Sequence, residues 1–255
     1  MAQIKVHLVL GVCVAAPFAF AGAMRVQTSL PTDTLFGRAV NESGFAVPLV
    51  VLGFAALWAF PALASVVGGD LFSAEDRYGT WATLLTRSRS RAELFAGKAI
   101  TALAFSVLAV AVLAVSSILA GILVVGSTPL IDLSGGLLQP REAFTRVVFA
   151  WASVLAPACA FAAMAMLVSV ATRSSAAGVS LPVVIGLLMQ LLAFVDGPEP
   201  IRRALITSSF GAWHGLLADP AYHAPLVHAT AVSVLYLTGC LIVAHRLLFR
   251  REIGR

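Results

Sequence analysis

The residues that could do chemistry in this chain are distributed unevenly. Nine of the 29 charged residues fall between Gly68 and Lys98, which is about an eighth of the 255 residues. This segment carries two adjacent acids, Glu75 and Asp76, and then a basic run in Arg87-Ser88-Arg89-Ser90-Arg91. A dense group of charges within apolar sequence is typical of a surface that meets a charged partner or anionic lipid headgroups.

The spacing between these charges predicts a short amphipathic helix. Its apolar stripe is formed by Tyr78, Trp81, Leu84 and Leu85, and its polar face by Asp76, Arg77, Thr80, Thr83 and Arg87. Such a helix lies in the membrane plane with its aromatic rings at headgroup depth. Acids near its start and arginines near its end complement the helix dipole. The residues alone leave two interpretations open: an interfacial anchor on anionic lipid, or a docking helix for a soluble cytoplasmic partner.

Composition identifies the setting of this helix. The chain is 60% hydrophobic and 11% charged, with a mean hydropathy of +0.95, whereas a soluble domain is roughly half apolar and about a quarter charged. These values exclude a soluble enzyme, a disordered protein and a disulfide scaffold. A net charge of +5 is small for nucleic-acid binding. The three cysteines, Cys13, Cys159 and Cys240, lie in apolar runs without metal-ligand spacing. We therefore predict a polytopic membrane protein.

Six apolar stretches are long enough to cross a bilayer as helices, which needs about 20 residues each. They cover roughly residues 6–24, 45–67, 99–125, 147–170, 176–195 and 226–248. We expect an all-α membrane protein whose single transmembrane domain spans residues 1–255. The loop 68–98 then separates the second and third spans, and the external segment 196–225 is expected to form re-entrant or surface helices. The first stretch also resembles a cleavable signal peptide, but its length favours a retained span.

The basic residues predict the orientation. With the N-terminus inside, 11 of the 17 Lys and Arg residues face the cytoplasm, and the net charges are +6 inside and −1 outside. The positive-inside rule therefore places both termini, and the loop 68–98, in the cytoplasm. We expect a multi-pass protein of the inner (plasma) membrane.

The loop carries a longer pattern that resembles a known family. The string Glu75-Asp76-x-x-Gly79-Thr80-x-x-x-Leu84-Leu85-Thr86-x-x-x-x-Arg91-x-x-Leu94-x-x-Gly97-Lys98 is similar to the signature loop of the type-2 ABC exporter permeases. Its position between the second and third of six spans also matches that family. The string covers about 25 residues, and the six-span plan covers the whole chain.

The resemblance implies a mechanism and partners. Such permeases pair as dimers, with a second copy or a homologous permease, and their in-plane coupling helix sits in a cleft of an ATP-binding subunit. ATP-driven closure of two such subunits switches the pathway between the permease halves. The residues implied in docking and coupling are Glu75, Asp76, Arg77, Tyr78, Gly79, Thr80, Leu84, Arg87, Arg91 and Lys98. Among these, Arg91 and Lys98 orient the return into the third span. ATP and magnesium are expected on the partner ABC ATPase, with membrane lipid around the spans.

No catalytic motif accompanies this pattern. Ala96-Gly97-Lys98-Ala99 mimics the end of a P-loop, but Ala99 replaces the hydroxyl residue that holds magnesium. The HExxH and GxSxG motifs are absent. We therefore expect no ATPase or other enzyme activity in this chain, and no bound cofactor. Two alternatives remain: a membrane scaffold or assembly subunit without transport, and, with less support, an intramembrane enzyme.

The remaining polar residues carry weaker signals. The external segment holds His214, Asp219, His223 and His228, which could form a metal or proton site or could be interfacial side chains; we favour the second interpretation and predict no metal site. No Asp, Glu, Lys or Arg occupies the middle of a predicted span, and polar side chains there are few, Gln190 among them. This argues against a proton- or sodium-coupled transporter and suits a pathway for an apolar or amphipathic substrate.

Overall fold

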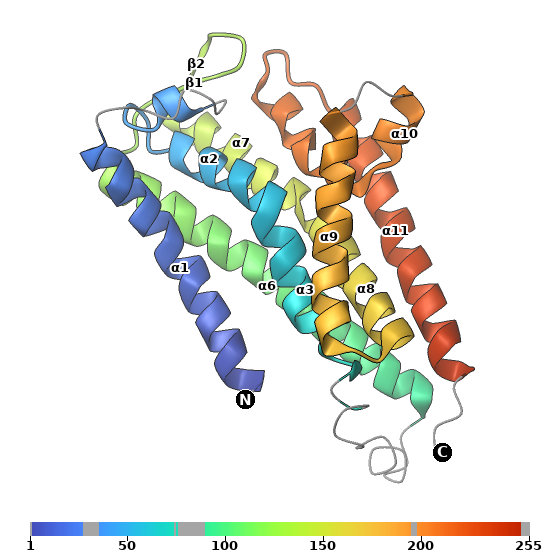
Figure 1. The fold of residues 1–255 in the computed structure, drawn as a ribbon. Coiled ribbons are helices and arrows are strands. Elements are labelled where there is room, and N and C mark those ends of the chain that lie inside the picture. The colour runs from blue at the N-terminus through green and yellow to red at the C-terminus, as the bar shows by residue number, and fades with distance from the viewer. Residues whose placement is uncertain (1, 28–35, 74, 76–89, 195–197, 251–255) are drawn as a thin grey trace. The chain divides into compact units, whose positions relative to one another are not determined.

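The computed structural model describes residues 2–27, 36–73, 75, 90–194 and 198–250. The protein is mostly helical (82%), and within the described residues six helical segments are long and apolar enough to cross a membrane (Figure 1). They cover Val6–Val26, Ala46–Gly68, Arg91–Val124, Pro140–Thr172, Ser175–Ala193 and Ala224–Phe249. The prediction of a helical protein with six candidate spans is confirmed, and each segment overlaps its predicted stretch.

Four of the spans are single helices. They are α1 (Ala2–Val26), α6 (Arg91–Val124), α9 (Ser175–Phe194) and α11 (Ala224–Phe249). The third span was expected to start at Ala99, but α6 starts at Arg91. Ser90 and Glu93 explain the earlier start, because they form a capping box. Ser90 Oγ accepts from Glu93 N at 3.2 Å, and Glu93 Oε2 accepts from Ser90 N at 3.1 Å.

The other two spans are interrupted. The second consists of α2 (Ala46–Phe54), a π-helical segment η2 (Ala55–Ala59) and α3 (Phe60–Gly68). The fourth consists of α7 (Pro140–Ser153) and α8 (Leu155–Thr172), which meet at Val154. Proline lies near both breaks, at Pro61 and Pro157, where the missing N–H removes a helical hydrogen bond.

Short elements lie between the spans. They are η1 (Gly37–Ala39), the antiparallel strands β1 (Leu130–Ile131) and β2 (Leu137–Leu138), α10 (Glu199–Ala204) and the 3-10 helix η3 (Ile206–Leu217). The described part of the segment 196–225 thus contains two short helices, α10 and η3. The expectation that they are re-entrant or surface helices stays a prediction.

Contacts divide the chain into two compact units. The first comprises Met1–Ala56, Leu108–Val154 and Gly211–Val227, and the second comprises Leu57–Val107, Leu155–Phe210 and His228–Arg255. The chain passes from the first unit to the second inside the π-helical segment of the second span.

The first unit contains a close approach between two backbones. A Cβ atom built on Gly121 of α6 would overlap the carbonyl oxygen of Gly44, and Gly44 N donates to Gly126 O at 3.0 Å. Helix ends in this unit are capped by side chains: Arg25 donates to Val124 O at 2.7 Å, and Asn41 donates to Met24 O at 3.2 Å. These bonds satisfy terminal carbonyls that have no partner within their own helices.

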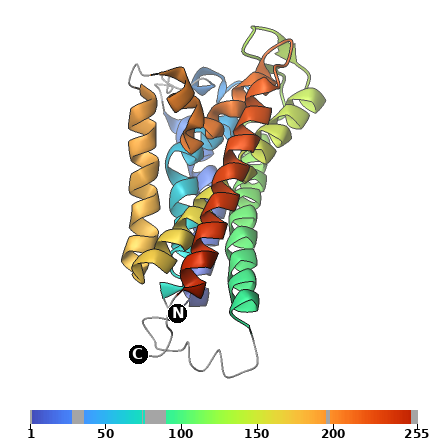
Figure 2. The same ribbon diagram turned by 90° about the vertical axis from the view of Figure 1, so that its right-hand side faces the viewer.

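The second unit is built around α3, α8 and α9, which run side by side in Figure 1. Small residues permit this packing: Gly68 lies against Ala162 O of α8, and the backbones of Gly69 and Gly178 leave no room for a Cβ atom. An apolar cluster of Phe72, Phe95, Ala99, Ala102, Met166, Val170, Ala244 and Leu248 also includes the first turns of α6 and the end of α11. Figure 2 shows these parts of α6 and α11 side by side.

The close contact between Gly44 and Gly121 in the first unit gives a prediction that can be tested with a control variant on the same helix. Gly121→Ala places a methyl group against the Gly44 backbone, so we expect a loss of about 1–3 kcal/mol in the free energy of unfolding. Gly97→Ala is the control on the same helix, because nothing lies within 4 Å of its added Cβ. Alanine there should be neutral or stabilise by up to about 1 kcal/mol. Thermal unfolding in detergent measures both, and equal midpoints would contradict the packing argument.

Candidate functional site

The structure places three of the ten predicted docking residues. Glu75, Arg91 and Lys98 are described, whereas Asp76–Thr80, Leu84 and Arg87 lie outside the described residues. The in-plane helix therefore stays a prediction. What the structure does show is how the two ends of the 76–89 segment are attached to the second unit. We call these attachments the loop root, formed by Asp70, Phe72, Ser73, Glu75 and Lys98 with their partners on α8 and α9.

Lys98 is the central residue of the loop root. Its Nζ donates to Glu75 Oε1 at 2.9 Å and to the carbonyl oxygen of Leu71, which follows α3, and lies 5.2 Å from the centroid of the Phe72 ring. The side chains of Lys98 and Glu75 are 14% and 23% exposed. The ammonium thus joins α6 to both the backbone and the carboxylate that precede the 76–89 segment. A partly buried pair of this kind is costly to break on one side, because the remaining charge loses its partner.

Two hydroxyl groups attach the same stretch to α8 and α9. Ser175, the first residue of α9, donates to Asp70 Oδ1. Ser169 Oγ of α8 accepts from Ser73 N at 3.1 Å, and Ser73 Oγ donates to Gly69 O at 2.9 Å. Gly69 O is therefore bonded within the stretch that follows α3, and Ser73 N is bonded by a side chain of α8.

The apolar cluster lies next to these polar contacts, because Phe72 belongs to both. The rings of Phe72 and Phe95 lie 5.7 Å apart, and Phe95 meets the ring of His245 edge-on at 5.3 Å. Phe72 is fully buried. The loop root is therefore held by side chains of α6, α8, α9 and α11, all within the second unit.

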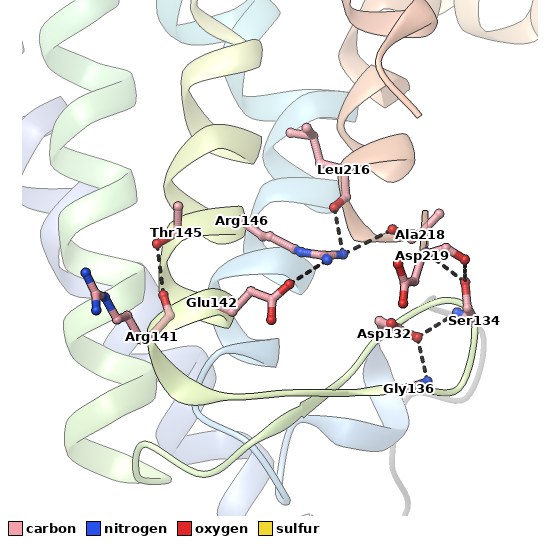
Figure 3. Close-up of polar contacts among 10 residues, drawn as sticks. All are labelled: Asp132, Ser134, Gly136, Arg141, Glu142, Thr145, Arg146, Leu216, Ala218 and Asp219. Carbon is pink, nitrogen blue, oxygen red and sulfur yellow. Dashed lines mark hydrogen bonds and ion pairs between the residues drawn. The ribbon is translucent and has the colours of Figure 1, made fainter. Parts of the chain in front are cut away.

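The first unit holds a separate polar network, shown in Figure 3. Arg146 of α7 donates to Leu216 O at 3.2 Å and to Ala218 O at 3.1 Å, and pairs with Glu142 at 2.6 Å. On the adjoining hairpin, buried Asp132 accepts from Ser134 N at 2.8 Å and Gly136 N at 2.7 Å. Ser134 Oγ accepts from Asp219 N at 2.9 Å. Each group has a structural partner, so the network holds the end of η3 against α7 and the hairpin.

His214, His223 and His228 lie in or just after the segment 196–225. Within the described residues, no group of three His, Cys, Asp or Glu side chains could hold a metal ion. His214 Nδ1 lies 2.6 Å from Gly211 O, and its ring lies 3.9 Å from that of Trp213. Burial lowers the pKa of His214, and the bond to Gly211 opposes that shift. His228 Nε2 lies 3.0 Å from Arg203 O. His214 and His228 take part in local contacts, and their position at a membrane interface stays a prediction.

Sequence reasoning missed part of the loop root. These residues are Asp70, Ser73, Ser169 and Ser175, for which the sequence predicts no role. No local signal marks them, because small hydroxyl residues are common in spans and their partners lie about 100 positions away in the chain. The orienting role of Lys98 stays a prediction, to which the structure adds the contacts with Leu71 and Glu75.

The Lys98 contacts generate a prediction about stability. Lys98→Met keeps the apolar stem but leaves Glu75 and Leu71 O without this donor, so we expect a loss of about 1–3 kcal/mol in the free energy of unfolding. Arg203→Met is the matched control, since Arg203 and Glu199 also pair but are 65% and 62% exposed. Its effect should stay below about 1 kcal/mol. If thermal unfolding shows the same loss of stability for both variants, Lys98 does not hold the loop root.

Two comparisons with known proteins bear on this arrangement. Residues 4–190 match a family model described as ABC-2 family transporter protein. Compared with curated proteins, the chain matches none. The family match covers the first five spans and the whole of the loop root.

Proposed function

The chain belongs to an ABC-2 type transporter permease family, and from this premise we propose that it is the membrane-spanning subunit of an ABC exporter. Members of such a family are transmembrane subunits that associate with ABC ATPases and are not ATPases themselves. In our proposal two permease chains, either copies of this chain or this chain and a homologue, form the substrate pathway. Separate ATPase subunits drive it, and the complex moves an apolar or amphipathic substrate outward.

The observation that carries this proposal is the construction of the loop root. The Lys98–Glu75 pair, at 2.9 Å, joins α6 to the stretch that precedes the segment 76–89. The two parts of the chain that flank this segment are therefore bonded to each other. Closure of an ATPase dimer against it would therefore reach α3, α6, α8, α9 and α11 directly, as a rigid-body transition requires.

The docking surface in this proposal is the predicted in-plane helix with its flanking charges. Glu75, Asp76, Arg77, Tyr78, Gly79, Thr80, Leu84 and Arg87 contact the ATPase, and Arg91 and Lys98 direct the return into α6. Both termini lie in the cytoplasm, and the protein resides in the inner (plasma) membrane. The support for this orientation is the charge bias of the sequence, with 11 of 17 basic residues on the side of the loop.

Docking is tested by co-purification with the ATPase. Gly79→Pro breaks the proposed helix and Glu75→Gln removes a charge at its start, so both should recover several-fold less ATPase from native membranes than the unchanged chain. Gly79→Ala is the matched control, because alanine favours a helix. Glu199→Gln, at an external position in the proposed orientation, should also leave recovery unchanged. Undiminished recovery with Gly79→Pro, in a chain that still elutes as a folded protein, would contradict the docking role.

A transport assay distinguishes an exporter subunit from a scaffold subunit that does not transport. The purified complex in lipid vesicles, with its ATPase sites outside, should accumulate a fluorescent phospholipid or an amphipathic cationic dye when ATP is supplied. It should not do so with a non-hydrolysable analogue. Lys98→Met should lower transport without lowering ATPase recovery, because the loop still docks but is poorly tied to the spans. A complex that binds its ATPase yet hydrolyses ATP without moving any cargo would favour the scaffold alternative.

A further inference from the structure

The backbone carbonyl of Leu57 in the second span lacks the hydrogen-bond donor that a regular α-helix would supply. Pro61 has no N–H, and in an α-helix the N–H of residue 61 would donate to the carbonyl of Leu57. The π-helical segment Ala55–Ala59 immediately precedes this position. Inside a bilayer no water replaces the missing donor, and an unsatisfied backbone group there costs several kcal/mol. The Leu57 carbonyl therefore lacks the donor that a regular α-helix would supply, and a donor from another helix can take its place.

Gln190 of α9 supplies that donor. Its Nε2 donates to Leu57 O at 2.6 Å across 133 positions of the chain. Gln190 is the one amide side chain within the six predicted spans, so its own burial in lipid also requires a partner. One hydrogen bond thus gives the Leu57 carbonyl a donor and the Gln190 amide an acceptor. Both residues belong to the second unit.

Packing one turn away supports the same pairing. Gly186 and Gln190 lie on the same face of α9, as do Leu57 and Pro61 in the second span, because residues four apart share a helix face. A Cβ atom on Gly186 would lie 3.6 Å from Pro61 Cβ and 3.2 Å from the Phe161 ring. The closer of these contacts is with Phe161 of α8, and the contact with Pro61 shows that α9 lies beside the second span one turn from Gln190.

We propose that Gln190 and Leu57 form a clasp that holds the π-helical turn and Pro61 of the second span against α9. With the clasp closed, the carbonyl freed by Pro61 is satisfied and α3 keeps its register on α9. With the clasp open, the Leu57 carbonyl must find another donor, and the first turn of α3 shifts. The clasp is a conformational device at the N-terminal end of α3. Asp70 and Ser73 of the loop root follow the C-terminal end of the same helix. Its effect on coupling rests on the proposed function.

The clasp is tested by removing and then restoring the donor. Gln190→Leu removes the amide, and Pro61→Ala returns a backbone N–H to Leu57 O, so the double variant should recover what the single variant loses. The unchanged chain and its variants are labelled with 5-fluorotryptophan and placed in lipid nanodiscs. The ¹⁹F signal of Trp58, the residue next to Leu57, is assigned with Trp58→Phe.

We expect Gln190→Leu to shift or broaden the Trp58 signal and Pro61→Ala in the same chain to restore it. The loss of one hydrogen bond within a membrane changes the closed-to-open ratio by about 5- to 30-fold. Gln190→Asn keeps the polarity but shortens the reach by one methylene, and should resemble Gln190→Leu. Ser180→Ala, at an exposed position of the same helix, should leave the signal unchanged. An unaltered Trp58 signal in Gln190→Leu, or no recovery in the double variant, overturns the clasp.

A second measurement addresses coupling alone. In the complex with the ATPase, Gln190→Leu should lower the transport per ATP hydrolysed, and Pro61→Ala should restore it. If the Trp58 signal responds as expected but transport per ATP does not change, the clasp stands and its role in coupling is overturned. Failure of the ATPase to bind the unchanged chain would instead refute the proposed function and leave the ¹⁹F result intact.

Discussion

The absence of water along the spans is the constraint on which the rest of this structure depends. Each backbone N–H and C=O group placed there must find its partner within the protein. Ser116 Oγ of α6 donates to Val14 O of α1 at 2.6 Å, Ser65 Oγ donates to Pro61 O at 2.6 Å, and Gln190 donates to Leu57 O at 2.6 Å. The first and last of these bonds join different spans. In so apolar a protein, a few hydrogen bonds therefore determine which helix faces meet.

The same constraint places the charges at the ends of the helices. Lys98 reaches the end of α3 and binds a carbonyl and a carboxylate there, while its stem lies by the apolar cluster of the second unit. Arg146 performs the corresponding task in the first unit, where it binds two carbonyls at the end of η3 (Figure 3). In both places one cation replaces the missing helical donors of another element. Membership in the permease family gives the first of these sites its functional meaning, because the loop it holds is the one expected to meet an ATPase.

Glycine determines how closely the helices approach. Gly44 meets Gly121 in the first unit, and Gly69 meets Gly178 in the second, with no space for a Cβ atom at either contact. Without a hydrophobic driving force between helices in lipid, such close packing contributes much of the association energy. Gly69 also lies next to Asp70, whose carboxylate binds Ser175. The close approach and the polar contact at the loop root therefore support each other.

The sequence by itself determined the class of fold, the six candidate spans and the position of the charged loop 68–98. Length and hydropathy are local properties, and a run of about 20 apolar residues spans a bilayer whatever its neighbours are. The capping box at Ser90 and Glu93 was equally local, and with it the start of α6 could have been placed at Arg91. Only the tertiary structure decided the partners of Lys98, Asp70 and Gln190. Those partners lie in other segments of the chain, up to 133 positions away, and no spacing within one helix encodes which part of the chain its side chains will meet.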